Sequence, residues 1–136
     1  MNISVSQAQG NVPVTVIKLD GQLDGQNYQE LISKAQELHQ AGTRNFLLDL
    51  SDLTYISSAG LVALHSVALL AKGEELPDAE GGWSAYRSMG RSTEAGMQKN
   101  VKLLNPRSEV MGVLDMVGFG NVFEIFTSRE EAVNSF

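Results

Sequence analysis

Two neighbouring hydroxyls stand where a strand is expected to pass into a helix. Residues 55–61 read Tyr-Ile-Ser-Ser-Ala-Gly-Leu, with a short apolar run at 45–50 before them and a largely apolar stretch at 59–71 after them. A serine at a helix start meets backbone N–H groups without intrahelical acceptors and the positive end of the helix dipole, so the position suits an anion. It is therefore a good place for a phosphoserine, although serine is also a preferred residue for simply capping a helix.

Other site chemistry finds little support in the sequence. There is no cysteine, no His-x-x-x-His pair, no phosphate-binding glycine loop of either common type and no G-x-S-x-G turn. His39 and His65 fall in different expected helices without ligand-spaced partners, so we expect no metal site and no cofactor. Ser58 as a hydrolase nucleophile would need a base within hydrogen-bond reach. Either histidine could be that base only if the fold happened to bring it next to Ser58. We expect a protein that is not an enzyme.

The composition indicates one globular domain. A chain of 136 residues suits a single core, and 43% hydrophobic with 19% charged residues is unlike a disordered chain. The net charge of −6, without a basic run, disfavours nucleic acid and anionic membranes and favours a protein or small-molecule partner. Without cysteine, a signal-peptide pattern or an apolar run that could span a bilayer, we expect a cytoplasmic protein.

Hydrophobic periodicity alternates between the spacing of strands and that of helices. Strands are expected at residues 3–5, 12–16, 46–50, 101–104 and 122–126. Helices are expected at residues 25–41, 57–71, 106–118 and from 128 onward. The order ββαβαβαβα predicts an α/β domain, with a mainly parallel mixed sheet, helices packed on it, and a leading β-hairpin as an antiparallel edge.

Turn and cap residues give the expected boundaries. Gly10-Asn11 is expected to turn the hairpin, and Gly21 to end its second strand. Asp24 is expected to cap the first helix and Gly42 to stop it, and Ser51-Asp52 should form a turn. Asn105-Pro106 is expected to open the third helix, and Ser128–Glu131 to form a capping box. The strand at 46–50 is apolar on both faces and is therefore expected at the centre of the sheet.

Residues 73–100 interrupt the pattern of alternating elements. The segment is glycine-rich and polar, lacks periodicity, and contains Trp83 with Tyr86 and Met89 at near-helical spacing. A connection of this length in a small domain is usually functional or disordered. The aromatic residues could form a short docking helix, or they could rest on the surface of the domain within a mobile excursion.

Several motifs together resemble the STAS domain, the fold of anti-sigma factor antagonists. In chain order they are Gly21–Asp24, Leu48–Ser51, Tyr55–Leu61, Val101–Pro106, Val113–Gly118 and Ser128–Ala132. The resemblance covers nearly the whole chain except residues 73–100. It implies a single STAS domain over residues 1–136 with an inserted segment at 73–100.

The resemblance implies a regulatory switch in bacterial transcription. Family members bind a partner kinase that is also an anti-sigma factor, are released when it phosphorylates them, and are reset by a phosphatase. Aligned through Gly60-Leu61, the acceptor is Ser58. Ser57 is the second choice, because it stands where the best-known antagonists carry an aspartate. The expected partner-binding residues are Asp24, Asp49, Asp52, Tyr55, Ile56, Ser57, Ala59, Gly60 and Leu61, and the three aspartates would repel a phosphate if they share one rim.

Two other interpretations stay open. A constitutive STAS adaptor subunit of a transport or signalling complex would use the serines only to cap the helix and would carry no phosphate. A small-molecule binder or weak serine hydrolase is the third possibility, and an acyl-serine probe that fails to label Ser57 or Ser58 would discard its catalytic form.

Overall fold

The computed structural model describes residues 1–72 and 98–136, so the expectations for Trp83, Tyr86 and Met89 lie outside the described residues. The strands are β1 (Asn2–Gln9), β2 (Pro13–Leu23), β3 (Phe46–Ile56), β4 (Val101–Leu104) and β5 (Ile125–Phe126). The helices are α1 (Tyr28–Gln40), α2 (Ser58–Ala71), α4 (Ser108–Met116) and α5 (Arg129–Asn134), with a 3-10 turn, η1, at Phe119–Asn121. The predicted order of strands and helices is confirmed.

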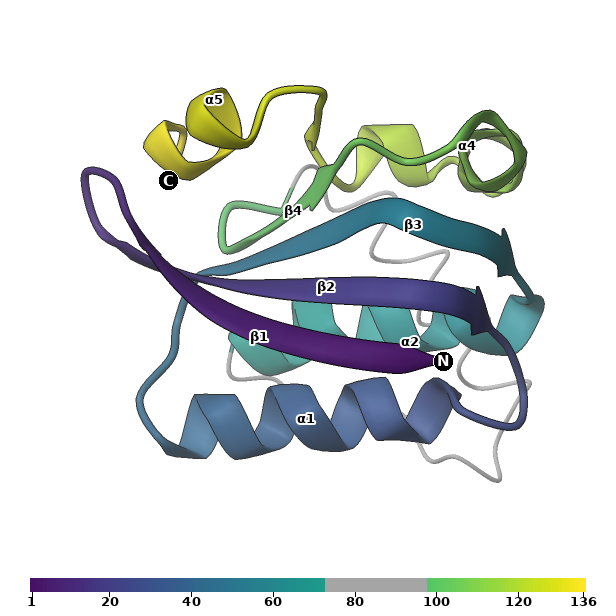
Figure 1. The fold of residues 1–136 in the computed structure, drawn as a ribbon, viewed down its shortest axis with the longest axis horizontal. Coiled ribbons are helices and arrows are strands. Elements are labelled where there is room, and N and C mark those ends of the chain that lie inside the picture. Colours follow the sequence, from purple (N-terminus) through teal and green to yellow (C-terminus); the bar gives the residue numbers. More distant parts are fainter. Residues whose placement is uncertain (73–97) are drawn as a thin grey trace.

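The strands form one five-stranded sheet in the order β1-β2-β3-β4-β5. β1 and β2 are antiparallel and make the predicted hairpin, with Gln9 opposite Pro13. The other pairs are all parallel, and β3 occupies the centre as expected (Figure 1). The predicted fold class, a mainly parallel mixed sheet with an antiparallel edge, is therefore confirmed.

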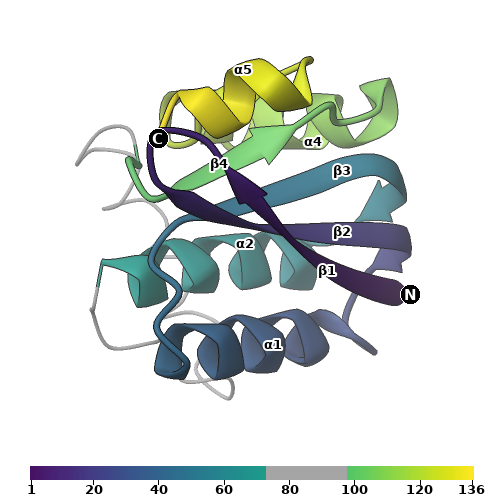
Figure 2. The same ribbon diagram turned by 60° about the vertical axis from the view of Figure 1, so that its left-hand side comes forward.

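The two faces of the sheet carry different cores. Ile17 and Leu48 belong to the main core, which α1, α2 and α4 help to form. Val16 and Leu47, the neighbouring positions on the same strands, belong to a smaller core beneath α5. Figure 2 shows α1 and α2 together on one side and α5 on the other. We call these sides the helix face and the α5 face.

Two expected strand ends instead lie within strands, next to shifts in register at which β3 carries the extra residue. β2 continues through Gly21 to Leu23, and the pairing with β3 shifts after Gly21, whose φ of +109° suits glycine. β3 likewise continues through Ser51-Asp52 to Ile56. Asp49 Oδ1 accepts hydrogen bonds from Ser51 N at 3.0 Å and Ser51 Oγ at 2.7 Å, which satisfies polar groups at the shift in register between Asp49 and Asp52. Glycine, serine and aspartate marked irregular backbone, but the irregularity lies within the strands.

The first helix begins later than expected. α1 starts at Tyr28, and Asn27 rather than Asp24 occupies its N-cap position. Asp24 Oδ1 instead accepts the N–H of Gln26 at 3.0 Å, which closes a turn before the helix. The expected stop is confirmed, because Gly42 has a φ of +113° and follows directly after the C-cap residue.

The boundaries after β4 also differ from expectation. α4 begins at Ser108, because Asn105 adopts a left-handed φ of 52° and donates its N–H to Phe126 O at 2.6 Å. This bond ties Asn105 to the last strand rather than to the helix. The expected helix end at Gly118 falls two residues later than Met116, the last helical residue.

The last strand is shorter than expected, since only Ile125–Phe126 pair with β4. Val122 and Phe123 are buried in the main core just after η1, so their apolar character reflects packing rather than strand pairing. The expected cap of α5 is confirmed by Ser128 Oγ, which accepts the N–H of Glu131 at 3.4 Å.

Candidate functional site

The site expected at residues 55–61 is the junction at which β3 passes into α2. Ser57 is the N-cap of α2, with extended backbone angles, and its Oγ accepts the N–H of Gly60 at 3.3 Å. Its own N–H donates to Leu23 O at 2.9 Å, which binds the junction to the end of β2. Of the two serines, Ser57 is therefore the one that caps the helix.

Ser58 differs from its neighbour in both exposure and bonding. It is the first residue of α2 and is exposed to solvent. Within residues 1–72 and 98–136, no hydrogen bond engages its hydroxyl. The first N–H groups of a helix have no acceptor one turn earlier, so the surroundings of Ser58 are electropositive. The hydroxyl is accessible to an enzyme, and its position tolerates a negative charge.

Gly60 allows α2 to begin tightly against the sheet. A β-carbon at this position would lie 2.6 Å from Ile56 Cγ1 and 2.8 Å from Leu23 O. Both distances are shorter than real β-carbon contacts, and one of the atoms is backbone. The glycine of the Ser-Ser-Ala-Gly-Leu motif is thus required by packing.

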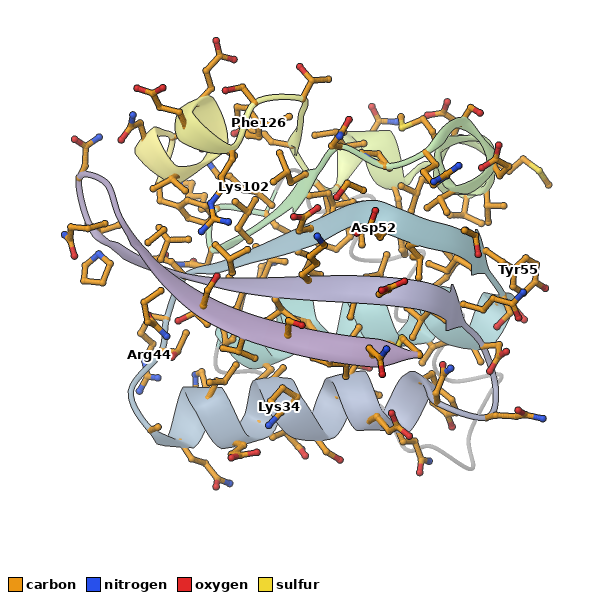
Figure 3. The ribbon with its side chains drawn as sticks, viewed as in Figure 1. Lys34, Arg44, Asp52, Tyr55, Lys102 and Phe126 are labelled. Carbon is orange, nitrogen blue, oxygen red and sulfur yellow. The ribbon has the colours of Figure 1, made fainter. Side chains whose placement is uncertain are left out.

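The residues expected to bind a partner divide into a buried and an accessible group. Ile56, Gly60 and Leu61 are buried, so they position the junction and offer a partner almost no surface. Tyr55 is 49% exposed, and Figure 3 shows it at the end of β3, directed away from the sheet. Ser57 and Ala59 are partly exposed. We refer to the accessible residues Asp24, Tyr55, Ser57, Ser58 and Ala59 as the α2 rim.

Asp24 reaches the α2 rim through the turn between β2 and α1. It directly follows Leu23, whose carbonyl is bonded to Ser57. Asn27 shapes this turn, since its Oδ1 accepts the N–H of Asp24 at 2.9 Å and its Nδ2 donates to Gln22 O at 2.7 Å. Sequence reasoning missed Asn27, although an asparagine just before a helix is a common signal of such a turn.

Asp49 and Asp52 lie on the α5 face and do not join the α2 rim, so the condition under which all three aspartates would repel a phosphate is not met. Asp52 lies 3.0 Å from Lys18 Nζ on the α5 face, and this contact raises the pKa of Lys18. Asp49 alternates with the core residues Leu48 and Leu50 and therefore also faces the α5 side. It lines a pocket of about 200 Å³, together with Asn105 and Arg129.

Neither histidine is placed to activate a serine. His65 is buried within α2, and burial, with a smaller contribution from Lys72, lowers its pKa to about 4. Burial and the nearby Arg44 lower the pKa of His39. Among the described residues, no hydrogen bond joins a histidine to Ser57 or Ser58, and no cluster of potential metal ligands occurs.

No helix in the described part of the chain is both long and apolar enough to cross a membrane. No curated protein matches the sequence significantly. Solved structures, however, share this fold. An anti-sigma factor antagonist from Mycobacterium paratuberculosis is 14% identical, with a TM-score of 0.64 over 98% of this chain and 93% of that one.

Two further structures extend the likeness. A putative anti-sigma factor antagonist from Thermotoga maritima is 17% identical, with a TM-score of 0.64 over 96% of this chain and 90% of that one. The Bacillus cell fate determinant SpoIIAA, in its phosphorylated form, is 18% identical, with a TM-score of 0.56 over 98% and 97%. At these identities the likeness establishes the fold. The family model described as "Mlab, STAS domain" matches residues 6–77, more than half of the chain, and the protein therefore belongs to the STAS domain family.

Proposed function

We propose that this protein is a non-enzymatic phospho-switch of the anti-sigma factor antagonist type, with Ser58 as the phosphoacceptor. The observation that carries the proposal is the exposed hydroxyl of Ser58, which stands at the first position of α2 without a hydrogen-bond partner in the described residues. Ser57 Oγ is already bonded to Gly60 N, so modification of Ser57 would disturb the cap.

The unphosphorylated α2 rim suits a protein partner. Tyr55 offers an exposed aromatic side chain, a residue type that often anchors interfaces, and the other rim residues apart from Asp24 are uncharged. The proposed partner is a cytoplasmic serine kinase that also acts as an anti-sigma factor. A phosphatase is the proposed enzyme that restores the unmodified form.

Phosphorylation of Ser58 is expected to weaken binding of the partner and so to release it. It adds a charge of about −1.5 to −2 at pH 7. The N-terminus of α2 tolerates this charge, so the fold is retained. A partner surface that fits a neutral hydroxyl would instead have to desolvate the phosphate, and Asp24 adds negative charge to the same rim. Bacillus SpoIIAA, which has this fold, exists in a phosphorylated form, and that likeness supports the proposal.

The first test is mass spectrometry of the protein isolated from the cells that make it, with and without phosphatase treatment. A single phosphate on Ser58 is the expected result. Ser57→Ala should leave this phosphate in place, whereas Ser58→Ala should abolish it. A phosphate on Ser57 alone would contradict the assignment of the acceptor.

Partner recovery tests the switch itself. Tagged Ser58→Ala should retain a co-purifying kinase under all growth conditions, and Ser58→Glu should lose it, because only the second carries a charge at the interface. Ser57→Ala is the matched control, since it removes a neighbouring hydroxyl from the same rim. Equal recovery of the partner by Ser58→Ala and Ser58→Glu would rule out the switch.

A constitutive adaptor subunit of a transport or signalling complex is the second candidate function. It is favoured by the family match, which is to the Mlab STAS domain, and by the serine at position 57. An adaptor would carry no phosphate on Ser57 or Ser58 in any condition, and it would co-purify with the same partner whichever residue stands at position 58.

A further inference from the structure

The outer edge of β1 is a border of the sheet that no other described strand pairs with. β1 runs from Asn2 to Gln9 and is paired with β2 along its full length, without a shift in register. It ends the strand order, and no other strand of the described residues lies on its far side. Figure 1 shows β1 beside β2, on the side away from β3. Alternate N–H and C=O groups of an edge strand point outward and are available for pairing.

Natural sheets often protect such an edge with charged residues, proline or a β-bulge, and β1 itself has none of these three. Its residues, NISVSQAQ, include no charge and no proline, and the strand contains no bulge. The opposite border of the sheet is very different, because β5 comprises only Ile125 and Phe126 and is followed at once by α5. β1 is therefore the one long, regular and uncharged border in the described sheet.

We propose that β1 pairs, antiparallel, with β1 of a second copy of this chain, so that two five-stranded sheets join into one sheet of ten strands. Pairing centred on Val5 places Val5 opposite Val5 and Ser4 opposite Ser6. Residues opposite one another share a face, so the helix faces of the two copies lie on the same side. The strand that pairs with the outer edge of β1 is thus β1 of the second copy.

The side chains favour a second copy. Ile3 and Val5 pair with the core residues Leu19 and Ile17, so they lie on the helix face, and Val5 is still 39% exposed. Two Val5 side chains at the centre of the pairing would cover one another, which is a favourable cross-strand contact. On the other face the centre consists of serine hydroxyls, which can hydrogen-bond across the strands.

Charge affects this association in a testable way. Each chain carries a net charge of −6, but none of that charge lies on β1, so no like charges meet across the proposed pairing. Repulsion between the two chains is then a long-range effect that salt screens. The dimer should become tighter as salt increases, whereas a dimer held by ion pairs would weaken.

Sedimentation equilibrium over about 1 to 500 µM tests the proposal, since a contact between two single strands buries little surface and should be weak. The wild-type mass should rise toward twice 14.7 kDa. Val5→Lys and Val5→Glu should each weaken association at least tenfold, because like charges would meet at the centre, and an equal mixture of the two should restore it. Val117→Lys is the matched control, a valine of similar exposure (37%) on another element.

Hydrogen exchange of the wild-type protein gives a second readout that needs no variant. Amides of β1 should exchange more slowly at high protein concentration, while those of α1 should not change. A wild-type chain that stays monomeric at about 500 µM would overturn the proposal, as would a dimer that Val5→Lys leaves intact. Protection of β1 by another protein in place of a second copy would overturn it too.

Discussion

Ser57 Oγ accepts the backbone N–H of Gly60 at 3.3 Å, and this one bond assigns different tasks to two adjacent serines. The hydroxyl of Ser57 is used to begin α2, whereas that of Ser58 stays exposed to solvent. Gly60 can approach Ser57 closely because it has no β-carbon to meet Ile56 and Leu23. Within the motif, Ser57 and Gly60 are thus needed for the start of α2, whereas Ser58 offers the accessible hydroxyl.

The paired serine variants should differ in stability. Ser57→Ala removes the cap of α2 and should lower the free energy of unfolding by about 1 kcal/mol. Ser58→Ala removes an exposed hydroxyl without a partner and should change it by less than about 0.5 kcal/mol. Urea denaturation at pH 7 measures both. A larger loss for Ser58→Ala than for Ser57→Ala would contradict the assignment of the cap.

Gly60→Ala should destabilise the junction. The new β-carbon would lie within 3 Å of both Ile56 Cγ1 and Leu23 O, and overpacking of this kind costs about 1–3 kcal/mol. Gly112→Ala is the control, since no atom lies within 4 Å of a β-carbon at that helical position. It should stabilise the protein by about 0.5–1 kcal/mol. Thermal unfolding of the two variants should therefore shift in opposite directions.

His65 should make stability depend on pH. Its pKa is lowered from 6.5 to about 4 in the folded protein, so between these values the unfolded chain binds a proton that the folded chain does not. Stability should therefore fall as pH decreases from 6.5 to 4, by up to about 3 kcal/mol. Denaturation at several pH values should show a flatter profile for His65→Asn.

The control for this pH profile is His39→Asn. His39 is only partly buried, so its removal should leave most of the slope in place. Carboxylate groups also titrate below pH 5, but they are common to all three proteins and cancel in the comparison. An equal slope for wild type and His65→Asn would refute the role of His65.

Lys102 should hold the end of α5 in place. It is only 4% exposed, and its Nζ donates to both Ser135 O and Ser135 Oγ at 3.0 Å. Figure 3 shows Lys102 close to Phe126, near α5. The ammonium also lies 4.9 Å from the centre of the Phe136 ring. Lys102→Met keeps the apolar stem but loses these contacts, and should cost about 2 kcal/mol.

Hydrogen exchange should show that this loss is concentrated in α5. Lys34→Met provides the control, because the Lys34–Glu37 ion pair on α1 is exposed and its removal should change stability by less than about 0.5 kcal/mol. Equal effects of the two substitutions would show that the contacts of Lys102 add nothing beyond those of a surface lysine.

The sequence alone was sufficient for the order of elements and for the central place of β3. Both depend on local periodicity, since residues such as Leu48 and Ile17 lie on one buried face by simple alternation. It also located the junction at Ser57, because the cap and the apolar helix after it are local signals. The family resemblance and the family match agree with these features.

Other features were decided only by tertiary structure. Gly21 and Ser51 lie within strands rather than at turns because β2 and β3 continue to pair beyond them, and pairing is a long-range interaction. Asp52 lies on the α5 face because the bulge in β3 and the ion pair with Lys18 place it there, whereas simple alternation with Leu48 and Leu50 already puts Asp49 on that face. The role of Gly60 was likewise not local: the glycine was expected to contact a partner, but it packs against Leu23 at the end of β2, a strand far from it in the chain. Local residue types indicate where the backbone is irregular and where a side chain is polar. Only packing between distant segments decides the path of that backbone and the surface on which that side chain lies.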